Sequence, residues 1–259
     1  EPNEKISAVM DKNLIYAHTL DDQEIVALMF KKYNLIAMPV VDTEERLVGI
    51  ITVDDVMDII EEENTEDLEK MNALAPSDDP YLKTNILQLA KNRIVWLLVL
   101  MLSATITGGI ISGFEDSLAV LPILVAFIPM LMDTGGNAGS QSSTLIIRGM
   151  ALGEIQLRDL GKVLWREVRI AFLCGLVLGA VNLVRIYIMN GHNFVLALTV
   201  TVSLLATILM AKSAGCILPM VAKKLHVDPA IMAAPLITTI VDAGSLVIYF
   251  SIARFIFNI

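Results

Sequence analysis

The sequence predicts an α-helical membrane protein with five transmembrane helices, preceded by a smaller and acidic α/β module. Three observations lead to this fold class. The 259 residues are 55% hydrophobic, yet charge is divided unevenly along the chain. Residues 1–92 carry 20 acidic and 8 basic side chains, whereas residues 93–259 carry 8 acidic and 11 basic ones. Apolar runs of about 20 residues, the length that crosses a bilayer, occur in the second part.

The N-terminal module alternates helix and strand patterns. Residues 20–30 have an acidic first turn and apolar positions at helical spacing, which predicts a helix. Two short β-branched runs, 37–41 and 47–51, flank a polar turn at 42–46 and predict a β-hairpin. A second helix is expected to begin near Val53. The module is therefore expected to be a compact α/β fold.

Acidic residues are dense between this module and the first apolar run. A run of charge on a helix usually marks a solvated face. Clustered carboxylates repel one another unless cations screen them, and hard divalent cations prefer carboxylate oxygens, so the density here favours a cation-sensing helix. The acids are Asp54, Asp55, Asp58, Glu61, Glu62, Glu63, Glu66, Asp67, Glu69, Asp78 and Asp79.

The second part contains five candidate spans. The last is expected to begin with Asp228 as the N-cap and Pro229 in the first turn. Lys and Arg concentrate in two of the connections, which are expected to be cytoplasmic, with the N-terminus inside and the C-terminus outside a cell membrane. Cys174 and Cys216 lack metal-ligand spacing and are interpreted as packing residues. The spans are residues 94–114, 118–147, 170–189, 194–222 and 229–257.

The second span contains a polar segment at residues 129–141. It holds three glycines, an Asn, a Gln and hydroxyl side chains. Irregular polar backbone at membrane depth is tolerated only inside a protein or along a water-filled path, so this segment predicts a break in the helix beside a pore or binding site. Asp133 opens it, either as the cap of a following helix or as an intramembrane acid.

Asp242 lies near the centre of the fifth span. An ionisable residue inside a membrane is by default a functional-site hypothesis; the alternative is a protonated carboxyl hydrogen-bonded to a neighbouring helix. Thr238, four residues earlier, shares its helix face. Pro235 is expected to leave the carbonyl near Ile231 unpaired. Lys212, in the fourth span, either reaches an interface or neutralises an acid.

The N-terminal module resembles a CBS domain. The resemblance is carried by Pro39-Val-Val-Asp42 and by the run from Leu47-Val-Gly-Ile-Ile to Asp55. It implies a second repeat whose partner lies upstream or in another chain, since CBS repeats work in pairs. It also implies ATP as a candidate ligand, with Thr52 and Asp55 contacting ribose and phosphate, against the alternative of a CBS fold that binds no nucleotide.

The membrane part resembles the MgtE family of magnesium channels. The matching residues are Gly135-Gly-Asn-Ala-Gly-Ser-Gln141, Ser143 to Arg148, Gly113-Phe-Glu115, and Asp228-Pro-Ala with Pro235 and Asp242. The resemblance implies a homodimer in the lipid bilayer, with a pore on its two-fold axis. Asp242 would recognise hydrated Mg²⁺ there, assisted by backbone oxygens of Gly136, Asn137 and Thr238. Asn34, Ser140 and Lys212 depart from the pattern of some relatives.

The family also has an acidic connecting helix, which corresponds to residues 64–75 and acts as a plug. Cytosolic Mg²⁺ would hold the pore shut by bridging acids of the CBS domain and this helix. These acids correspond to Asp55, Asp58, Glu63, Glu66 and Asp67. The expected domains are residues 1–62 (CBS), 63–92 (connecting helix and linker) and 93–259 (pore).

The predicted function is a magnesium channel rather than an enzyme, with no role in binding nucleic acid. Three alternatives stay open. A CBS-regulated secondary transporter of another divalent cation is the main one. An intramembrane aspartyl protease could use Asp133 and Asp242, but the Gly-x-Gly-Asp signature is missing. A non-conducting sensor would leave the polar segment unexplained.

Overall fold

The structure is a computed structural model, and it describes residues 5, 8, 10, 13–77, 81–232 and 234–258. The chain divides into two compact units, Glu1–Glu66 and Asp67–Ile259, which are described separately. Asp78 and Asp79 of the acidic run lie outside the described residues.

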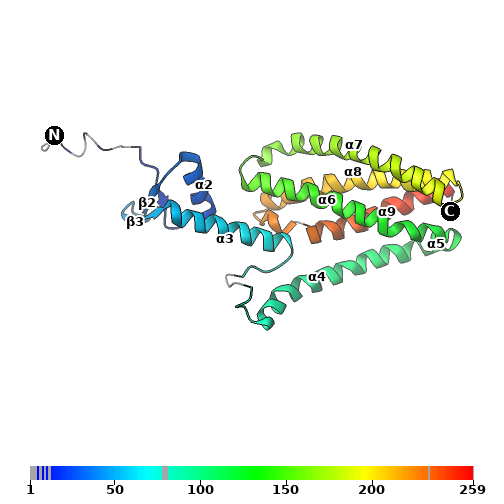
Figure 1. The fold of residues 1–259 in the computed structure, drawn as a ribbon, viewed down its shortest axis with the longest axis horizontal. Helices are drawn as coiled ribbons and strands as arrows, with labels where there is room; N and C mark the ends of the chain where they lie inside the picture. The colour runs from blue at the N-terminus through cyan, green and yellow to red at the C-terminus, as the bar shows by residue number, and fades with distance from the viewer. Residues whose placement is uncertain are drawn as a thin grey trace. The chain divides into compact units, whose positions relative to one another are not determined.

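The first unit is a small α/β fold, as predicted (Figure 1). Its strands β1 (Ala17–His18), β2 (Ala37–Val41) and β3 (Leu47–Thr52) form a sheet in the order β1-β2-β3, with β1 parallel and β3 antiparallel to β2. The hairpin turn is held by Asp42, whose Oδ1 accepts the backbone N–H groups of Glu44 and Arg46.

The helix α2 (Gln23–Tyr33) begins later than expected because Asp22 caps it: its side chain accepts the N–H of Glu24. The buried face of α2 supplies Val26, Ala27 and Phe30 to the core of this unit, where they pack with Met38 of β2. The small apolar core therefore forms between this helix face, the sheet and Val56 of the helix that follows β3, and the spacing of the α2 residues predicts its buried face.

The acidic run lies on one continuous helix, α3 (Val53–Met71). The expectation of a separate connecting helix over residues 64–75 is therefore wrong. These residues belong to the second half of α3, which ends at Met71, four residues before the expected end. Ala73 has a left-handed backbone conformation (φ 56°), which ends the helical path. The boundary between the two units falls within α3, after Glu66.

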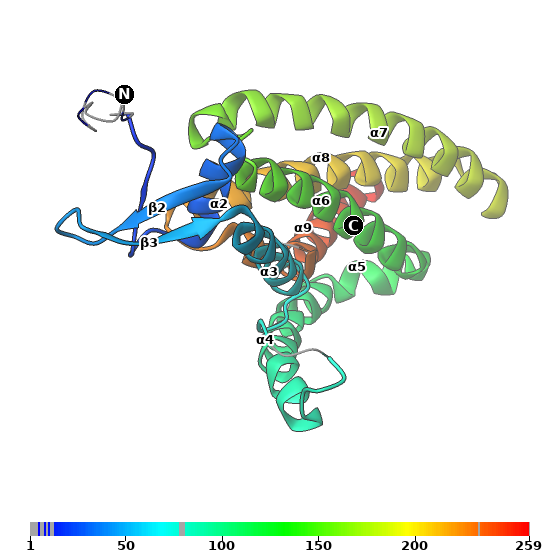
Figure 2. The ribbon, with the colours of Figure 1, turned by 60° about the vertical axis from the view of Figure 1, so that its left-hand side comes forward.

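The second unit is a helical bundle (Figures 1 and 2). The helix α8 occupies its middle and packs against α6, α7 and α9, while α4 packs against α9. Successive long helices run in opposite directions. The elements are α4 (Ile86–Gly113), α5 (Glu115–Val120), η1 (Pro122–Phe127), α6 (Ile128–Ala151), η2 (Leu157–Asp159), α7 (Leu160–Met189), α8 (Phe194–Lys224), η3 (Pro229–Met232) and α9 (Ala234–Phe257).

Among the described residues, four helical segments are long and apolar enough to cross a membrane: Ile86–Gly113, Leu157–Met189, Phe194–Lys224 and Pro229–Phe257. The remaining predicted span, the second (residues 118–147), corresponds to α6, which is more polar. Its 24 residues extend about 36 Å, enough for a hydrocarbon core of about 30 Å. The α7 helix starts ten residues before the predicted span, so Lys162, Arg166 and Arg169 lie in its first turns.

The predicted break at residues 129–141 is wrong, because α6 runs through the segment as a continuous helix. Asp133 accordingly lies inside α6 and does not cap it. Close packing explains the glycines: a Cβ on Gly139 would lie 3.2 Å from the carbonyl oxygen of Ala211, and one on Gly215 of α8 would lie 2.2 Å from the carbonyl oxygen of Gly139. Small residues let the backbones of membrane helices approach this closely.

The start of α9 also differs from the expectation. Pro235 is the second residue of this helix, where a missing N–H breaks no helical hydrogen bond. The Pro235 carbonyl instead accepts the hydroxyls of Thr238 and Thr239. Asp228 acts as a cap, but of η3, since its Oδ1 accepts the N–H of Ala230.

Candidate functional site

Four polar residues form an exposed stripe along α6: Asp133, Asn137, Gln141 and Thr144. Their spacing of four, four and three residues places them on one face of the helix. The Nδ2 of Asn137 donates to Oδ1 of Asp133 over 3.1 Å, so the first two members are joined. Polar side chains in this number do not face lipid without a partner or water, so the α6 stripe marks a polar surface within the membrane domain.

Glycines bring the backbone of α6 against α9 next to this stripe. Gly136 is buried, and a Cβ there would lie 3.0 Å from Cγ2 of Thr238. A Cβ on Gly135 would lie 2.9 Å from Cγ1 of Val241. Two of the predicted site residues, Gly136 and Thr238, are therefore in contact, and a side chain larger than hydrogen at Gly136 would push α9 away.

Asp242 follows Thr238 by one helical turn and is half-buried. Asp133 of α6 lies close enough for its negative charge to act on the Asp242 carboxyl. The two acids thus lie in the same region between α6 and α9. The sequence is compatible with two roles for Asp133, and its spacing from Asn137 and Gln141 indicates a shared helix face.

The backbone oxygens predicted to assist Asp242 are in regular helix. The carbonyls of Gly136 and Asn137 belong to the interior of α6, where each accepts a helical hydrogen bond. They can offer an ion or its water only their second lone pair, and the freely available donors and acceptors of the α6 stripe are its side chains.

The acids of α3 are spread along the helix. Asp55 Oδ2 accepts both the hydroxyl (2.5 Å) and the backbone N–H (3.0 Å) of Thr52, which ties the third residue of α3 to the residue just before the helix. These hydrogen bonds, the hydroxyl first, lower the pKa of Asp55 below its ordinary value. Thr52 and Asp55, the two residues expected to contact a nucleotide, therefore hydrogen-bond to each other.

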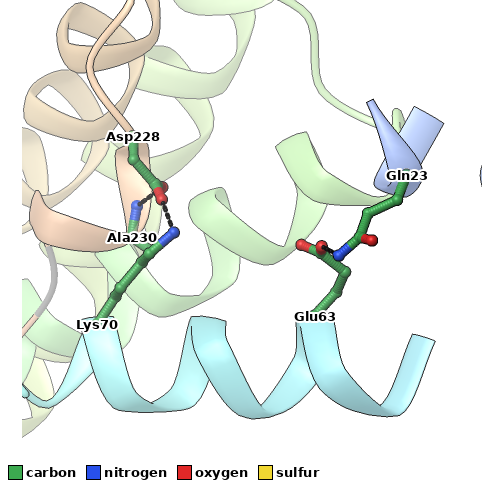
Figure 3. Close-up of polar contacts among 5 residues, drawn as sticks. All are labelled: Gln23, Glu63, Lys70, Asp228 and Ala230. Atoms are coloured by element: carbon green, nitrogen blue, oxygen red, sulfur yellow. Dashed lines mark hydrogen bonds and ion pairs between the residues drawn. The ribbon is translucent and has the colours of Figure 1, made fainter. Parts of the chain in front are cut away.

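Glu63 also has a partner within the first unit: its Oε1 accepts Nε2 of Gln23 over 2.6 Å (Figure 3). Asp58 is exposed, while Glu66 and Asp67 are half-buried. Within the described part of the chain, no three His, Cys, Asp or Glu side chains come together as a metal-binding group.

The last turn of α3 belongs to the second unit and makes an ion pair that the sequence did not indicate. Lys70 Nζ lies 2.7 Å from Oδ2 of Asp228, whose other oxygen holds the N–H of Ala230 (Figure 3). Met71 packs beside it against Ile147 and Ala230. The end of α3 is therefore fastened to the start of η3 by a charge contact and an apolar one.

The partner of Lys212 is Glu167 of α7, and both side chains are buried with Ser142 of α6. Lys212 therefore neutralises an acid and does not reach for an interface. Cys216 is buried in an apolar cluster, as its packing interpretation requires, while Cys174 is exposed on α7.

Comparison with known proteins bears on this geometry. The family model of the MgtE divalent cation transporters matches residues 128–252, which run from the start of α6 to near the end of α9. The CBS domain model matches residues 6–62. The magnesium transporters MgtE of Thermus thermophilus and Bacillus subtilis are each 39% identical over 98% of this chain, and that of Enterococcus faecalis is 36% identical over 96%. The chain belongs to the MgtE family.

Membership in the MgtE family confirms the resemblance drawn from the glycine-rich signature, and the CBS match confirms the assignment of the first unit. The relatives are transporters and not enzymes, as predicted. The chain spans about half the length of these relatives, 56%, 55% and 54% respectively.

Proposed function

We propose that this chain forms the pore and part of the cytosolic regulatory region of a magnesium channel. The observation that carries the proposal is the exposed α6 stripe beside Asp242 in a membrane helix bundle. An exposed polar face of one chain is expected to meet water or its own symmetry mate, because lipid cannot satisfy it. Relatives named as magnesium transporters support Mg²⁺ as the cargo.

The proposed path lies on the two-fold axis of a homodimer. Two copies of Asp242, each with Asp133 nearby, would place several negative charges around one divalent cation. Mg²⁺ gives up its water shell reluctantly, so polar side chains of the α6 stripe would bind the hydrated ion through its waters. Thr238 and Gly136 would set how closely α6 and α9 approach at that level.

Closure by cytosolic Mg²⁺ is the second part of the proposal. If Mg²⁺ binds the acids of α3 better in the closed state, rising cytosolic Mg²⁺ shifts the population toward closure. Asp55, Asp58, Glu63, Glu66 and Asp67 supply oxygen ligands of the right chemistry. They would have to be completed by a symmetry mate, since one described chain does not gather three of them.

Orientation follows from charge. Arg148, Lys162, Lys223 and Lys224 lie at the end of the bundle where α6 and α8 end and α7 begins. An excess of Lys and Arg marks cytoplasmic ends, so this end would face the cytosol and the C-terminus would lie outside. ATP binding by the CBS domain stays a prediction, and it would require Thr52 and Asp55 to exchange their mutual hydrogen bonds for nucleotide contacts.

The decisive experiment measures Mg²⁺ flux into proteoliposomes with Asp242→Asn, which removes the charge and keeps the shape. We expect flux to fall to the level of protein-free vesicles while the unfolding temperature in detergent is retained. Asp116→Asn, an exposed acid of α5, is the matched control and should conduct normally.

Normal flux through a folded Asp242→Asn protein would reject the path. The main alternative, a secondary transporter of another divalent cation, is separated by flux assays and electrical recording on the same reconstituted protein. A channel carries single-channel currents down the Mg²⁺ gradient alone, whereas a coupled transporter requires the gradient of a second ion.

A further inference from the structure

Three side chains from three helices meet inside the membrane bundle away from the α6 stripe. Ser142 Oγ of α6 donates to Oε2 of Glu167 of α7 over 2.6 Å. Lys212 Nζ of α8 donates to the same Ser142 Oγ over 3.2 Å. The exposed fractions of Ser142, Glu167 and Lys212 are 1%, 7% and 5%. We call this group the buried charge triad.

The hydroxyl of Ser142 is the link of the triad. Lys212 Nζ and Glu167 Oε2 are 4.0 Å apart, too far for a hydrogen bond, so the charges are connected through a group that accepts from one and donates to the other. Charged groups are costly inside a bilayer, and such residues are retained where they pair and serve a purpose. Breaking one member of a buried pair leaves an uncompensated charge.

The triad fixes α6 where apolar packing alone would not. Membrane helices gain little from burying apolar surface against each other, because lipid is equally apolar, so polar contacts and close backbone approach decide their register. Next to Ser142, α6 and α8 touch backbone to backbone at Gly139 and Gly215. The triad and this contact together define both the rotation and the depth of α6 against α7 and α8.

The same rotation sets the direction of the α6 stripe. Ser142 follows Asn137 by five residues, which places it about 140° around the helix. The triad therefore holds the back of α6, while Asp133, Asn137 and Gln141 occupy the exposed front. Turning α6 by releasing Ser142 would also move Gly136 against Thr238, with which it is in tight contact.

From this geometry we infer that Ser142, Glu167 and Lys212 are positioning residues for the ion path, setting the orientation of the α6 stripe beside Asp242. The inference rests on the proposed function for its link to transport, but its geometric part can be tested without Mg²⁺.

The first readout is the rate at which a membrane-impermeant thiol reagent modifies Asn137→Cys, in a chain also carrying Cys174→Ser and Cys216→Ala. Ser142→Ala is expected to change this rate by at least about fivefold, the scale of an appreciable coupling between sites. Ser142→Thr keeps the hydroxyl and should restore the rate. Ser203→Ala is the matched control, because the buried Ser203 hydroxyl donates to the carbonyl oxygen of Thr199 in its own helix and, among the described residues, to no other helix.

The second readout is the Mg²⁺ concentration that gives half-maximal flux in proteoliposomes, measured with native Asn137. It should shift by at least about fivefold in Ser142→Ala and in the charge-free double variant Lys212→Met/Glu167→Leu, which removes both ions together. Unfolding temperature is recorded for each, and the double variant carries the test if Ser142→Ala fails to fold.

The inference would be overturned if Ser142→Ala and the double variant kept the wild-type modification rate and the wild-type half-maximal Mg²⁺ concentration, even with a change in stability. The buried charge triad would then have a purely structural role. Absence of Mg²⁺ flux in the unmodified protein would contradict the proposed function instead. The thiol-modification result would then still decide the positioning role.

Discussion

At the scale of single residues, small contacts decide the candidate path. Gly136 is buried against Thr238, and Asn137 on the next position is exposed and bonded to Asp133. One residue therefore sets the helix spacing while its neighbour presents a polar group. Close helix packing at the glycines and exposure of the polar side chains between them explain why glycines and polar residues alternate in the signature at residues 135–141 of α6.

We expect Gly136→Ala to reduce Mg²⁺ flux strongly while leaving the protein folded. The added Cβ would lie 3.0 Å from Cγ2 of Thr238, so α6 and α9 must separate slightly beside Asp242; overpacking of this kind costs about 1–3 kcal/mol. Gly109→Ala on α4 is the same change with nothing within 4 Å, and it should leave flux and unfolding temperature unaltered. Equal flux in the two variants would contradict this account.

The Thr52–Asp55 contact makes a pH-dependent contribution to the stability of the folded protein. The folded pKa of Asp55 is lowered by the Thr52 hydrogen bonds, so the contribution is fully present above the ordinary aspartate value of about 3.9 and is lost as pH falls through the lower folded value. Thr52→Val removes the hydroxyl donor and should raise the Asp55 pKa toward the ordinary value. Titration of the Asp55 carboxyl carbon by NMR checks this, and an unmoved inflection would mean that the hydroxyl is not the cause.

At the scale of elements, α3 and α6 are the two helices on which the proposed function depends. The α3 helix begins in the CBS domain and ends with Lys70 paired to Asp228 at the membrane unit. The α6 helix has a buried glycine-rich side and an exposed polar side. Both are continuous where the sequence suggested a boundary or a break.

Neutralising three acids of α3 should weaken closure by internal Mg²⁺. In patch recordings, we expect Glu63→Gln/Glu66→Gln/Asp67→Asn to need at least about tenfold more internal Mg²⁺ for half-inhibition, because fewer carboxylates favour the bound closed state. The control is Glu44→Gln/Glu45→Gln in the β2–β3 turn, which keeps wild-type inhibition. A triple variant with an unchanged inhibition curve would reject a sensor role for α3.

At the scale of the whole molecule, the exposed α6 stripe is expected to meet water or a second chain, because lipid cannot satisfy its polar groups. A single chain leaves Asp133, Asn137, Gln141 and Thr144 uncovered in the membrane part. A two-fold axis passing this face would bring identical residues opposite each other, as isologous interfaces do. The proposed dimer therefore follows from an unsatisfied polar surface as well as from the family resemblance.

Oxidative cross-linking tests this arrangement. In a Cys216→Ala background, Asn137→Cys should form a disulfide-linked dimer in membranes, detected on a non-reducing gel. Cys174, exposed on α7, serves as the internal control, because in chains with native Asn137 it should leave the protein monomeric on the gel. Cross-linking through Cys174, with none through the thiol introduced by Asn137→Cys, would place the symmetry axis at α7 and contradict the proposed path.

Much of this architecture could be read from the sequence. Apolar runs of bilayer length fixed the long helices, β-branched runs around a polar turn fixed the β2–β3 hairpin, and the isolated Asp242 in an apolar stretch indicated a site. These features are local, because hydrophobic periodicity, turn chemistry and the cost of a charge in lipid act along the chain itself.

The tertiary structure decided what depends on neighbours. Glycines that suggest a break in isolation stay helical in α6 because the backbones of α8 and α9 pack against them. The partner of Lys212 could not be chosen from the sequence, since Glu167 lies on another helix and is joined through a serine on a third. Local patterns determine which segments form helices and strands, whereas contacts between distant segments determine which faces are buried and which polar groups meet.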